Sequence, residues 1–533
     1  HVNMVATNCP GGHRGGIMID GILGLVGNLS NEIGHFWLGL DSARATGHLG
    51  ILLLCLLLAY AFEFVNGFHD TANAVATVIY TKSLKPWPAV VWAGICNFLG
   101  VFVGGTVVAM AIIKLVPPDL IMASDVNTSM AFVFSLLMGA VIWNLGTWYF
   151  GIPASSSHTL IGSILGIGIA HSYMKTGSIV NGVNWAKAYD VGLALFVSPL
   201  IGFGLAALIL IAIKKIFRNP TLHSPPKTGQ PPPWHVRAAL IFTSTGVSFA
   251  HGSNDGQKGV GLVMLILIAL MPAQFALRPD AELTEIRETL AATERLPGLI
   301  DESYKASLAL KENHQLSLNI KVIPEARAAS LAQPADLGRV DKIKANLNSI
   351  REQIGHVNGT DQLEGRARFE IRNSIFSLDK NLGDLEKSKS PMIQTAQWSE
   401  IKKIRGKLLK LTDYAPTMVL LLIALSLGLG TMIGWKRIVV TIGEKIGKSH
   451  LTYAQGASAE LVAMGTIGIS AVLGLPVSTT HVLSSGIAGT MVANRSGVQS
   501  STVNKILSAW VLTLPMSILL SASLYILIVK FLI

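Results

Sequence analysis

Two polar stretches interrupt apolar segments of this chain, and the two stretches match each other. Residues 64–73 align without a gap with residues 249–258, and the phenylalanine, the glycine and the aspartate coincide. A second pair of motifs, residues 151–158 and 474–481, reads glycine, an apolar residue, proline, alanine or valine, three hydroxyl residues and histidine. Both motif types occur in the same order in both halves, so the sequence indicates an internal duplication.

The composition is that of a membrane protein. Of the 533 residues, 50% are apolar and 14% are charged, whereas a soluble domain typically carries about 25% charged residues. Several apolar runs reach about 20 residues, the length that crosses a ~30 Å hydrocarbon core. The formal net charge of +11 fits cytoplasmic Lys and Arg residues that set topology, so we expect no nucleic-acid partner. The three cysteines have neither metal-ligand nor disulfide spacing, and we expect no resident metal or cofactor.

The two halves differ by an insertion. Asp70 precedes Pro153 by 83 residues, whereas Asp255 precedes Pro476 by 221, so the second half contains 138 additional residues. Residues 273–412 are hydrophilic, with 22 basic and 19 acidic residues, and show amphipathic helical periodicity. They predict a soluble helical domain inserted between two membrane spans.

We therefore expect an all-α polytopic membrane protein. Its predicted architecture is an inverted-repeat secondary transporter with two re-entrant helical hairpins and an inserted soluble α-helical domain. In chain order the expected divisions are a poorly ordered N-terminal extension (1–48), a first membrane repeat (49–214), an inter-repeat linker (215–235) and a second membrane repeat (236–272 and 413–533) that is interrupted by the inserted domain (273–412).

Basic residues set the expected orientation in the membrane. If residues 130–171 and 452–493 each form a re-entrant hairpin, each half makes three net crossings, and an odd number inverts the second half relative to the first. Most Lys and Arg residues of the short loops then lie on the cytoplasmic side, which supports this orientation. The inserted domain and both termini would lie on the opposite side.

The hydroxyl motifs predict an anion site. Pro153 and Pro476 are expected to begin the second arm of each hairpin, which leaves the following N–H groups free. Hydroxyl donors beside helix N-terminal N–H groups suit a tetrahedral oxyanion, and two such ends meeting across a pseudo-two-fold axis could enclose one. Helix capping or packing is the alternative role. The predicted substrate-binding residues are Ser155, Ser156, Ser157, Ser478, Thr479 and Thr480.

The aspartate motifs predict a coupling-cation site. A carboxylate repels a bound anion, but a cation between the two, or protonation of Asp70 and Asp255, removes the conflict. We expect Gly67 and Gly252 to permit helix breaks at these motifs. The predicted coupling residues are Asn66, Asp70, Asn73, Asn254, Asp255 and Glu460. Side chains expected to support the site are His69, His158, His251, His481, Asn144 and Lys258, of which Lys258 either attracts the anion or extends toward a membrane interface.

At these residues the chain resembles the PiT inorganic phosphate transporter family, most closely its bacterial low-affinity Pit type. The family pattern Gly-x-x-Asp-x-x-Asn is present at 67–73 and in part from Gly252 to Asp255, and Pro-x-Ser-x-x-His is present at 153–158 and 476–481. The resemblance implies symport of phosphate, held on the hydroxyl motifs, with a coupling cation near the aspartates. It also implies a multi-pass protein of the bacterial inner membrane, which would place the inserted domain in the periplasm.

The resemblance also suggests which cation is used. Bacterial Pit relatives resemble proton-coupled carriers of phosphate, often as a neutral complex with Mg²⁺ or another divalent metal, and we expect the same here. Many members have Asn where Lys258 stands, so the two halves are not expected to bind cations equally. Eukaryotic members, which the resemblance implies are coupled to Na⁺, carry Glu where this chain has Asn97, and this difference argues against Na⁺ coupling in this chain.

Several alternatives stay open at the level of sequence. The same donors would suit a Na⁺-coupled phosphate symporter or a sulfate permease of the same fold. An intramembrane hydrolase using Ser, His and Asp is disfavoured because the hydroxyl triplets repeat symmetrically and no single serine stands out. A receptor with the inserted domain as its sensor is a further class. The expected partners are inorganic phosphate and the lipid bilayer, and a homo-oligomer is left open.

Overall fold

The regular structure of this chain is helical. The computed structural model describes residues 15–116, 120, 126–179, 182–226, 230–279, 281, 283–316, 334–354, 363–388, 390, 393 and 396–532. Within these residues every extended element is a helix, and the only β-type pairing is an isolated bridge between Gly447 and Val498.

The two halves contain corresponding helices. The first half has α2 (Leu49–Tyr80), α3 (Pro86–Val103), α4 (Val107–Ile113), α6 (Val126–Tyr149), α7 (Ser156–Thr176) and α8 (Trp185–Ile216). The second half has α10 (Trp234–Leu270), α17 (Thr417–Met432), α18 (Lys436–Glu444), α19 (Tyr453–Val472), α20 (Thr479–Ala493) and α21 (Ser500–Leu532). The short helix α9 (Pro220–His223) lies between the halves.

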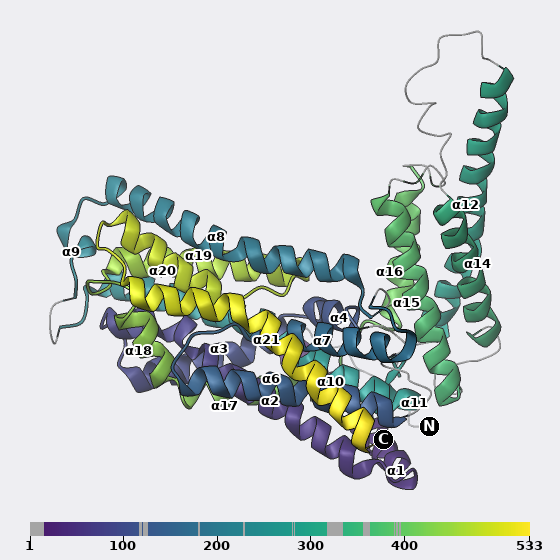
Figure 1. Ribbon diagram of the computed structural model, residues 1–533, viewed down its shortest axis with the longest axis horizontal. Helices are drawn as coiled ribbons and strands as arrows, with labels where there is room; N and C mark the ends of the chain where they lie inside the picture. Colours follow the sequence, from purple (N-terminus) through teal and green to yellow (C-terminus); the bar gives the residue numbers. More distant parts are fainter. Residues whose placement is uncertain are drawn as a thin grey trace.

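The packing of the helices repeats as their order does. Helix α3 packs against α10 as α17 packs against α2, α8 packs against α20 as α21 packs against α7, and α6 packs against α2 as α19 packs against α10 (Figure 1). Because α2 and α10 also contact each other, the two motif-bearing helices lie together at the centre of this arrangement. The helical contacts therefore preserve the duplication seen in the motifs.

The expected helix breaks at Gly67 and Gly252 are wrong. Helices α2 and α10 run through both motifs without interruption. A Cβ at Gly67 would meet backbone of α17, and one at Gly252 would overlap the carbonyl oxygen of Asn97 on α3. The absent side chains let neighbouring helices approach closely, which is the other use of glycine between membrane helices. The bends occur elsewhere, and the α17–α18 pair turns by 63° between Met432 and Lys436.

Five of the described helices are long and apolar enough to cross a membrane, or six if the bent α17–α18 pair is one span. The five are Leu49–Tyr80, Pro86–Val103, Asn127–Tyr149, Ala188–Ile216 and Ser500–Phe531. Large apolar side chains on these helices are exposed, among them Leu57, Phe196 and Val511, as expected for surfaces in contact with lipid. Helix α10, predicted as a span, is not among the five, and its polar motif residues lower its mean hydropathy.

From Gly15 onward, the predicted N-terminal extension is helical rather than poorly ordered, and its first 14 residues lie outside the described part of the chain. Helix α1 covers Gly15–Ala45, and the Glu32 carboxylate accepts the N–H groups of Thr417 and Met418 at 2.8 and 2.9 Å. Those N–H groups begin α17 and have no partner within that helix, so Glu32 caps it from outside. The prediction missed this because capping by a residue almost 400 positions away leaves no local pattern.

Between α10 and α17, four helices of the described residues form a separate group. They are α12 (Leu283–Leu316), α14 (Pro334–Ile354), α15 (Gly365–Lys387) and α16 (Trp398–Lys410), preceded by the short α11 (Pro272–Phe275). Figure 1 shows them at one end of the other helices, and Ile343, Leu378 and Ile404 belong to a hydrophobic cluster of their own. The Arg278 N–H donates to the Leu411 carbonyl at 2.8 Å, so the chain enters and leaves this group at one place.

Candidate functional site

Two helix N-termini meet inside the protein. Helix α7 begins after Ser155, whose Oγ accepts the N–H of His158 at 3.2 Å, and α20 begins after Ser478, which does the same for His481 at 3.2 Å. The imidazole rings of His158 and His481 lie 4.7 Å apart, centre to centre, although 323 residues separate them. The hydroxyl motifs of the two halves thus form one buried cluster.

Within each triplet, the first hydroxyl caps a helix and the other two contact residues of the aspartate motifs. Ser155 and Ser478 are N-cap residues, so their side chains stabilise the helix ends. Pro153 and Pro476 precede these caps by two residues and lie outside the helices, contrary to the prediction that they begin them. The second and third hydroxyls are the ones that reach the aspartate motifs, and they are Ser156, Ser157, Thr479 and Thr480.

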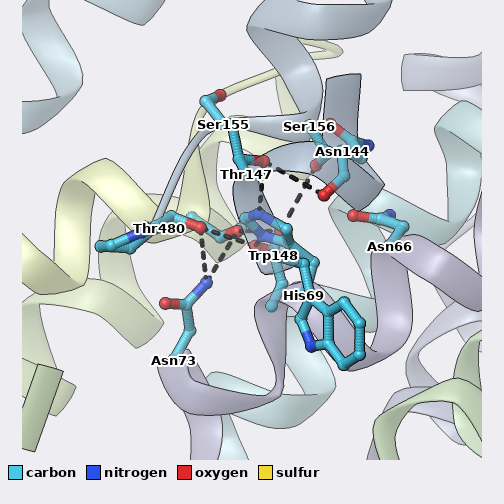
Figure 2. A network of polar contacts seen from close by, with 12 residues as sticks. Asn66, His69, Asn73, Asn144, Thr147, Trp148, Ser155, Ser156 and Thr480 are labelled. Carbon is cyan, nitrogen blue, oxygen red and sulfur yellow. Dashed lines mark hydrogen bonds and ion pairs between the residues drawn. The ribbon is translucent and has the colours of Figure 1, made fainter. Parts of the chain in front are cut away.

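Asp70 lies between both hydroxyl triplets. Thr480 donates to Asp70 Oδ1 at 2.7 Å, and Ser156 donates to Asp70 Oδ2 at 3.3 Å, so one carboxylate contacts the helix ends of both halves. Asn73, one turn further along α2, donates to Thr480 Oγ1 at 3.0 Å (Figure 2). His69 Nδ1 lies 3.2 Å from Asp70 Oδ1, and its Nε2 lies 3.2 Å from the Thr147 hydroxyl. These side chains are all buried.

Asp255 has a different environment. Its Oδ1 lies 2.7 Å from the ammonium of Lys258, which belongs to the next turn of α10. Lys258 also donates to Ser157 Oγ and, at 3.4 Å, to the Val477 carbonyl. The lysine is fully buried and directed into the site, so it does not extend to a membrane interface. One of the two aspartates is therefore paired with a cation of the protein itself.

His251 lies between the two aspartates. Its Nε2 is 3.7 Å from Asp70 Oδ2 and 3.5 Å from Asp255 Oδ2, while its Nδ1 is 3.1 Å from Asn97 Oδ1. The ligand atoms of Asp70, His251 and Asp255 lie within 4.8 Å of one another, a separation at which they could hold one cation. The sequence placed His251 among supporting side chains, whereas the structure gives it a direct contact with both carboxylates.

Other predicted residues lie around this centre or apart from it. Asn254 donates to the Leu475 carbonyl at 3.1 Å, next to the start of the second hydroxyl motif. Glu460 on α19 is fully buried and accepts hydrogen bonds from Thr77 and Thr243, which lie on α2 and α10 away from the aspartates. Asn144 is buried, and its side-chain nitrogen and oxygen have no hydrogen-bond partner among the described residues.

Sequence reasoning missed Glu63. This carboxyl group is fully buried on α2, and its Oε1 accepts from Asn66 Nδ2 at 3.2 Å, which accounts for the position of Asn66. Its Oε2 has no hydrogen-bond partner in the part of the chain that the structure describes, and it points toward Gly259 of helix α10. An acidic residue within an apolar span is itself a functional signal, so the criterion applied to Asp70 would also have selected Glu63.

The geometry fits joint binding of an anion and a cation. The N-termini of α7 and α20 provide backbone N–H groups and partial positive charge. The four hydroxyls beside them can donate either to a carboxylate or to an oxyanion, because a hydroxyl hydrogen rotates. The aspartates then need a proton or a cation once an anion arrives, since like charges this close repel strongly in a buried site.

Comparison with known proteins gives consistent matches. The model of the phosphate transporter family matches residues 66–521. The low-affinity inorganic phosphate transporter PitA of Escherichia coli strain K12 is 42% identical over 512 residues, which cover 93% of this chain and 100% of PitA. PitB of the same strain is 39% identical, covering 89% of this chain and 96% of PitB.

Two further matches are less similar to this chain. A probable low-affinity inorganic phosphate transporter of Bacillus subtilis strain 168 is 27% identical, covering 89% of this chain and 96% of its own length. A solved structure titled "The sodium-dependent phosphate transporter" is 19% identical, with a TM-score of 0.49 and coverage of 90% of this chain and 100% of its own.

Proposed function

This chain belongs to the phosphate transporter family, and we propose that it is a secondary active symporter that imports inorganic phosphate together with protons. It is a transporter and not an enzyme, as the named relatives are transporters. The observation that supports the proposal most is the placement of Asp70, whose carboxylate contacts hydroxyls from both halves at the point where the two helix N-termini meet.

Phosphate would bind between the N-termini of α7 and α20. The hydroxyls of Ser156, Ser157, Thr479 and Thr480 would turn from their present acceptors to the phosphate oxygens, with backbone N–H groups adding further donors. Phosphate carries negative charge near neutral pH, so its binding is unfavourable while Asp70 is ionised. Protonation of Asp70 removes that repulsion, and this mutual dependence couples the two solutes.

We extend the proposal to the form of the substrate. A neutral complex of phosphate with Mg²⁺ or another divalent metal would place a cation beside the anion, and among the described residues Asp70, His251 and Asp255 form a group that could receive it. In that case the metal is part of the cargo. Coupling to Na⁺ through the same oxygen ligands, and transport of sulfate, are the alternatives that the experiment below separates.

We also propose the arrangement in the membrane. The two halves, 49–214 and 236–272 with 413–533, would form inverted repeats, each with a re-entrant hairpin at 130–171 or 452–493. The helices within 273–412 would form a soluble domain on the periplasmic side of a bacterial inner membrane, and 215–235 would join the repeats. The repeated helix contacts and the separate hydrophobic cluster of the inserted helices support this arrangement.

Uptake of ³²P-phosphate into proteoliposomes tests the transport function. A pH gradient, a Na⁺ gradient and Mg²⁺ are varied separately, with excess sulfate added in a parallel series and protein-free liposomes as the blank. We expect accumulation that is driven by an inward proton gradient, does not need Na⁺ and resists sulfate. Accumulation only with Na⁺ would replace protons as the coupling ion, and equal inhibition by sulfate and phosphate would assign a general oxyanion permease.

A further inference from the structure

We propose that the ammonium group of Lys258 is a built-in cation that occupies the second cation position of the site, so that only the Asp70 half binds a mobile coupling ion. The inference deepens the proposed symport and rests on it. In this proposal the charge of Lys258 is fixed by the protein, and the charge that balances Asp70 comes from solution.

The internal duplication identifies Lys258 as the counterpart of Asn73. Each stands three residues after the aspartate of its motif, and each donates to the third hydroxyl of the opposite half, Asn73 to Thr480 and Lys258 to Ser157. The two half-sites therefore share this contact between the motif helix and the opposite hydroxyl triplet. They differ in that an amide is present at one position and an ammonium group at the other.

Oxygen atoms surround the ammonium as they would surround a metal cation. They come from a carboxylate, a hydroxyl and a backbone carbonyl, namely Asp255 Oδ1 at 2.7 Å, Ser157 Oγ and Val477 O at 3.4 Å. A lysine has three N–H donors; two of them are hydrogen-bonded to Ser157 and Val477, and the ammonium charge pairs with the Asp255 carboxylate. The side chain is fully buried, so its charge stays within the site.

Because of this pairing, the charge of Asp255 is balanced within the protein, and the charge of Asp70 is not balanced by a lysine or arginine among the described residues. Asp255 is neutralised by Lys258, whereas Asp70 contacts hydroxyls, His69 and His251 and has no lysine or arginine beside it among the described residues. An anion that enters between the helix ends then requires one further positive charge, at Asp70. The structure thus assigns one mobile proton or cation to this site instead of two.

Three replacements of Lys258 test whether its positive charge, and not the size of its side chain, is what the site requires. Lys258→Asn gives the second half-site the amide that Asn73 provides in the first, and so replaces the ammonium group with an oxygen ligand. We expect phosphate uptake into proteoliposomes without Na⁺ to fall roughly tenfold or more, as for loss of one buried opposite charge, and to recover when Na⁺ is added. Lys258→Met has neither charge nor oxygen ligand, and its loss should not recover with Na⁺. Lys258→Arg keeps the charge and should transport without Na⁺.

Three outcomes would overturn the inference. They are Na⁺-free uptake by Lys258→Asn at the wild-type rate, equal recovery of the Asn and Met variants with Na⁺, and a Na⁺ requirement in Lys258→Arg. If the Asn variant does not yield a single gel-filtration peak, the Arg variant still decides, because its Na⁺ requirement can be measured alone.

Cation binding can be followed without transport, which separates failure of this inference from failure of the proposed function. Na⁺ should raise the Tm of Lys258→Asn more than that of the wild-type protein, because the variant gains a binding position. This difference is expected whatever anion is carried. An equal Na⁺ effect on both proteins would contradict the built-in cation even if phosphate uptake is confirmed.

Discussion

Replacement of Asp70 by asparagine removes the charge on which coupling depends and keeps the side chain's shape. The carboxylate accepts hydrogen bonds from Thr480 at 2.7 Å and Ser156 at 3.3 Å. An amide can still accept on one side, and its NH₂ group can donate to hydroxyl oxygens, which act as acceptors as well. We therefore expect Asp70→Asn to fold and to elute as the wild-type protein does.

The expected loss of transport follows from the lost charge. A monovalent cation about 4 Å from a carboxylate gains roughly 4 kcal/mol at an effective dielectric constant of about 20. That energy corresponds to about a thousandfold in cation affinity. An asparagine at position 70 stays neutral, so it neither repels phosphate nor takes up the coupling cation, and phosphate accumulation driven by the cation gradient should fall by about two to three orders of magnitude.

The assay is ³²P-phosphate accumulation in proteoliposomes under an inward proton gradient. Asp190→Asn is the matched control, because it removes a carboxylate whose side chain is 40% exposed and pairs with Lys387 away from the site. It should transport as the wild-type protein does. Accumulation by Asp70→Asn within about threefold of wild type, far short of the predicted loss of about two to three orders of magnitude, would refute a coupling role for Asp70.

Three further changes test the packing and the site. Thr480→Val loses the hydroxyl that links Asp70 to the second half and should reduce uptake by roughly tenfold, whereas Thr480→Ser should keep it; equal activities would contradict the role of the hydroxyl. Gly252→Ala places a methyl group against a carbonyl of α3, which should lower the free energy of unfolding by about 1–3 kcal/mol and so lower the Tm measured in detergent. The control is Gly465→Ala, whose added methyl group meets no atom within 4 Å and should leave the Tm unchanged. Replacement of residues 280–410 by a short Gly-Ser linker should leave phosphate uptake intact, because the chain enters and leaves these helices at one place; loss of uptake by a folded, inserted variant would contradict a peripheral role.

The features that could be predicted from the sequence are those that occur in both halves, namely the aspartate motifs and the hydroxyl motifs. Both motif pairs could be aligned by eye, and the structure brings Asp70 into contact with Ser156 and Thr480 as two facing helix ends would require. The helical class and the transporter family followed from composition and from the same motifs. Each of these signals lies within one short stretch of chain, or in a comparison of two such stretches.

The remaining features depend on contacts between distant residues. Glycine at 67 and 252 permits either a break or a close approach, and only the neighbouring helices α17 and α3 show that packing is the reason. His251 appeared to be a supporting residue until the fold placed it between two carboxylates. Similarly, Lys258 pairs with Asp255 of its own helix and donates to Ser157 of the other half. The second contact joins the two halves of the chain, so the sequence alone did not show whether the lysine points into the site or toward a membrane interface.

The most direct test of the central claim is to locate the bound anion. Arsenate has the shape and charge of phosphate, and its arsenic atom can be placed by anomalous scattering from crystals of the protein grown with arsenate. The account predicts one arsenic peak per chain between the N-termini of α7 and α20, within hydrogen-bonding reach of hydroxyls from both triplets and next to Asp70. A peak elsewhere in the protein, with none between these two helix ends, would contradict it.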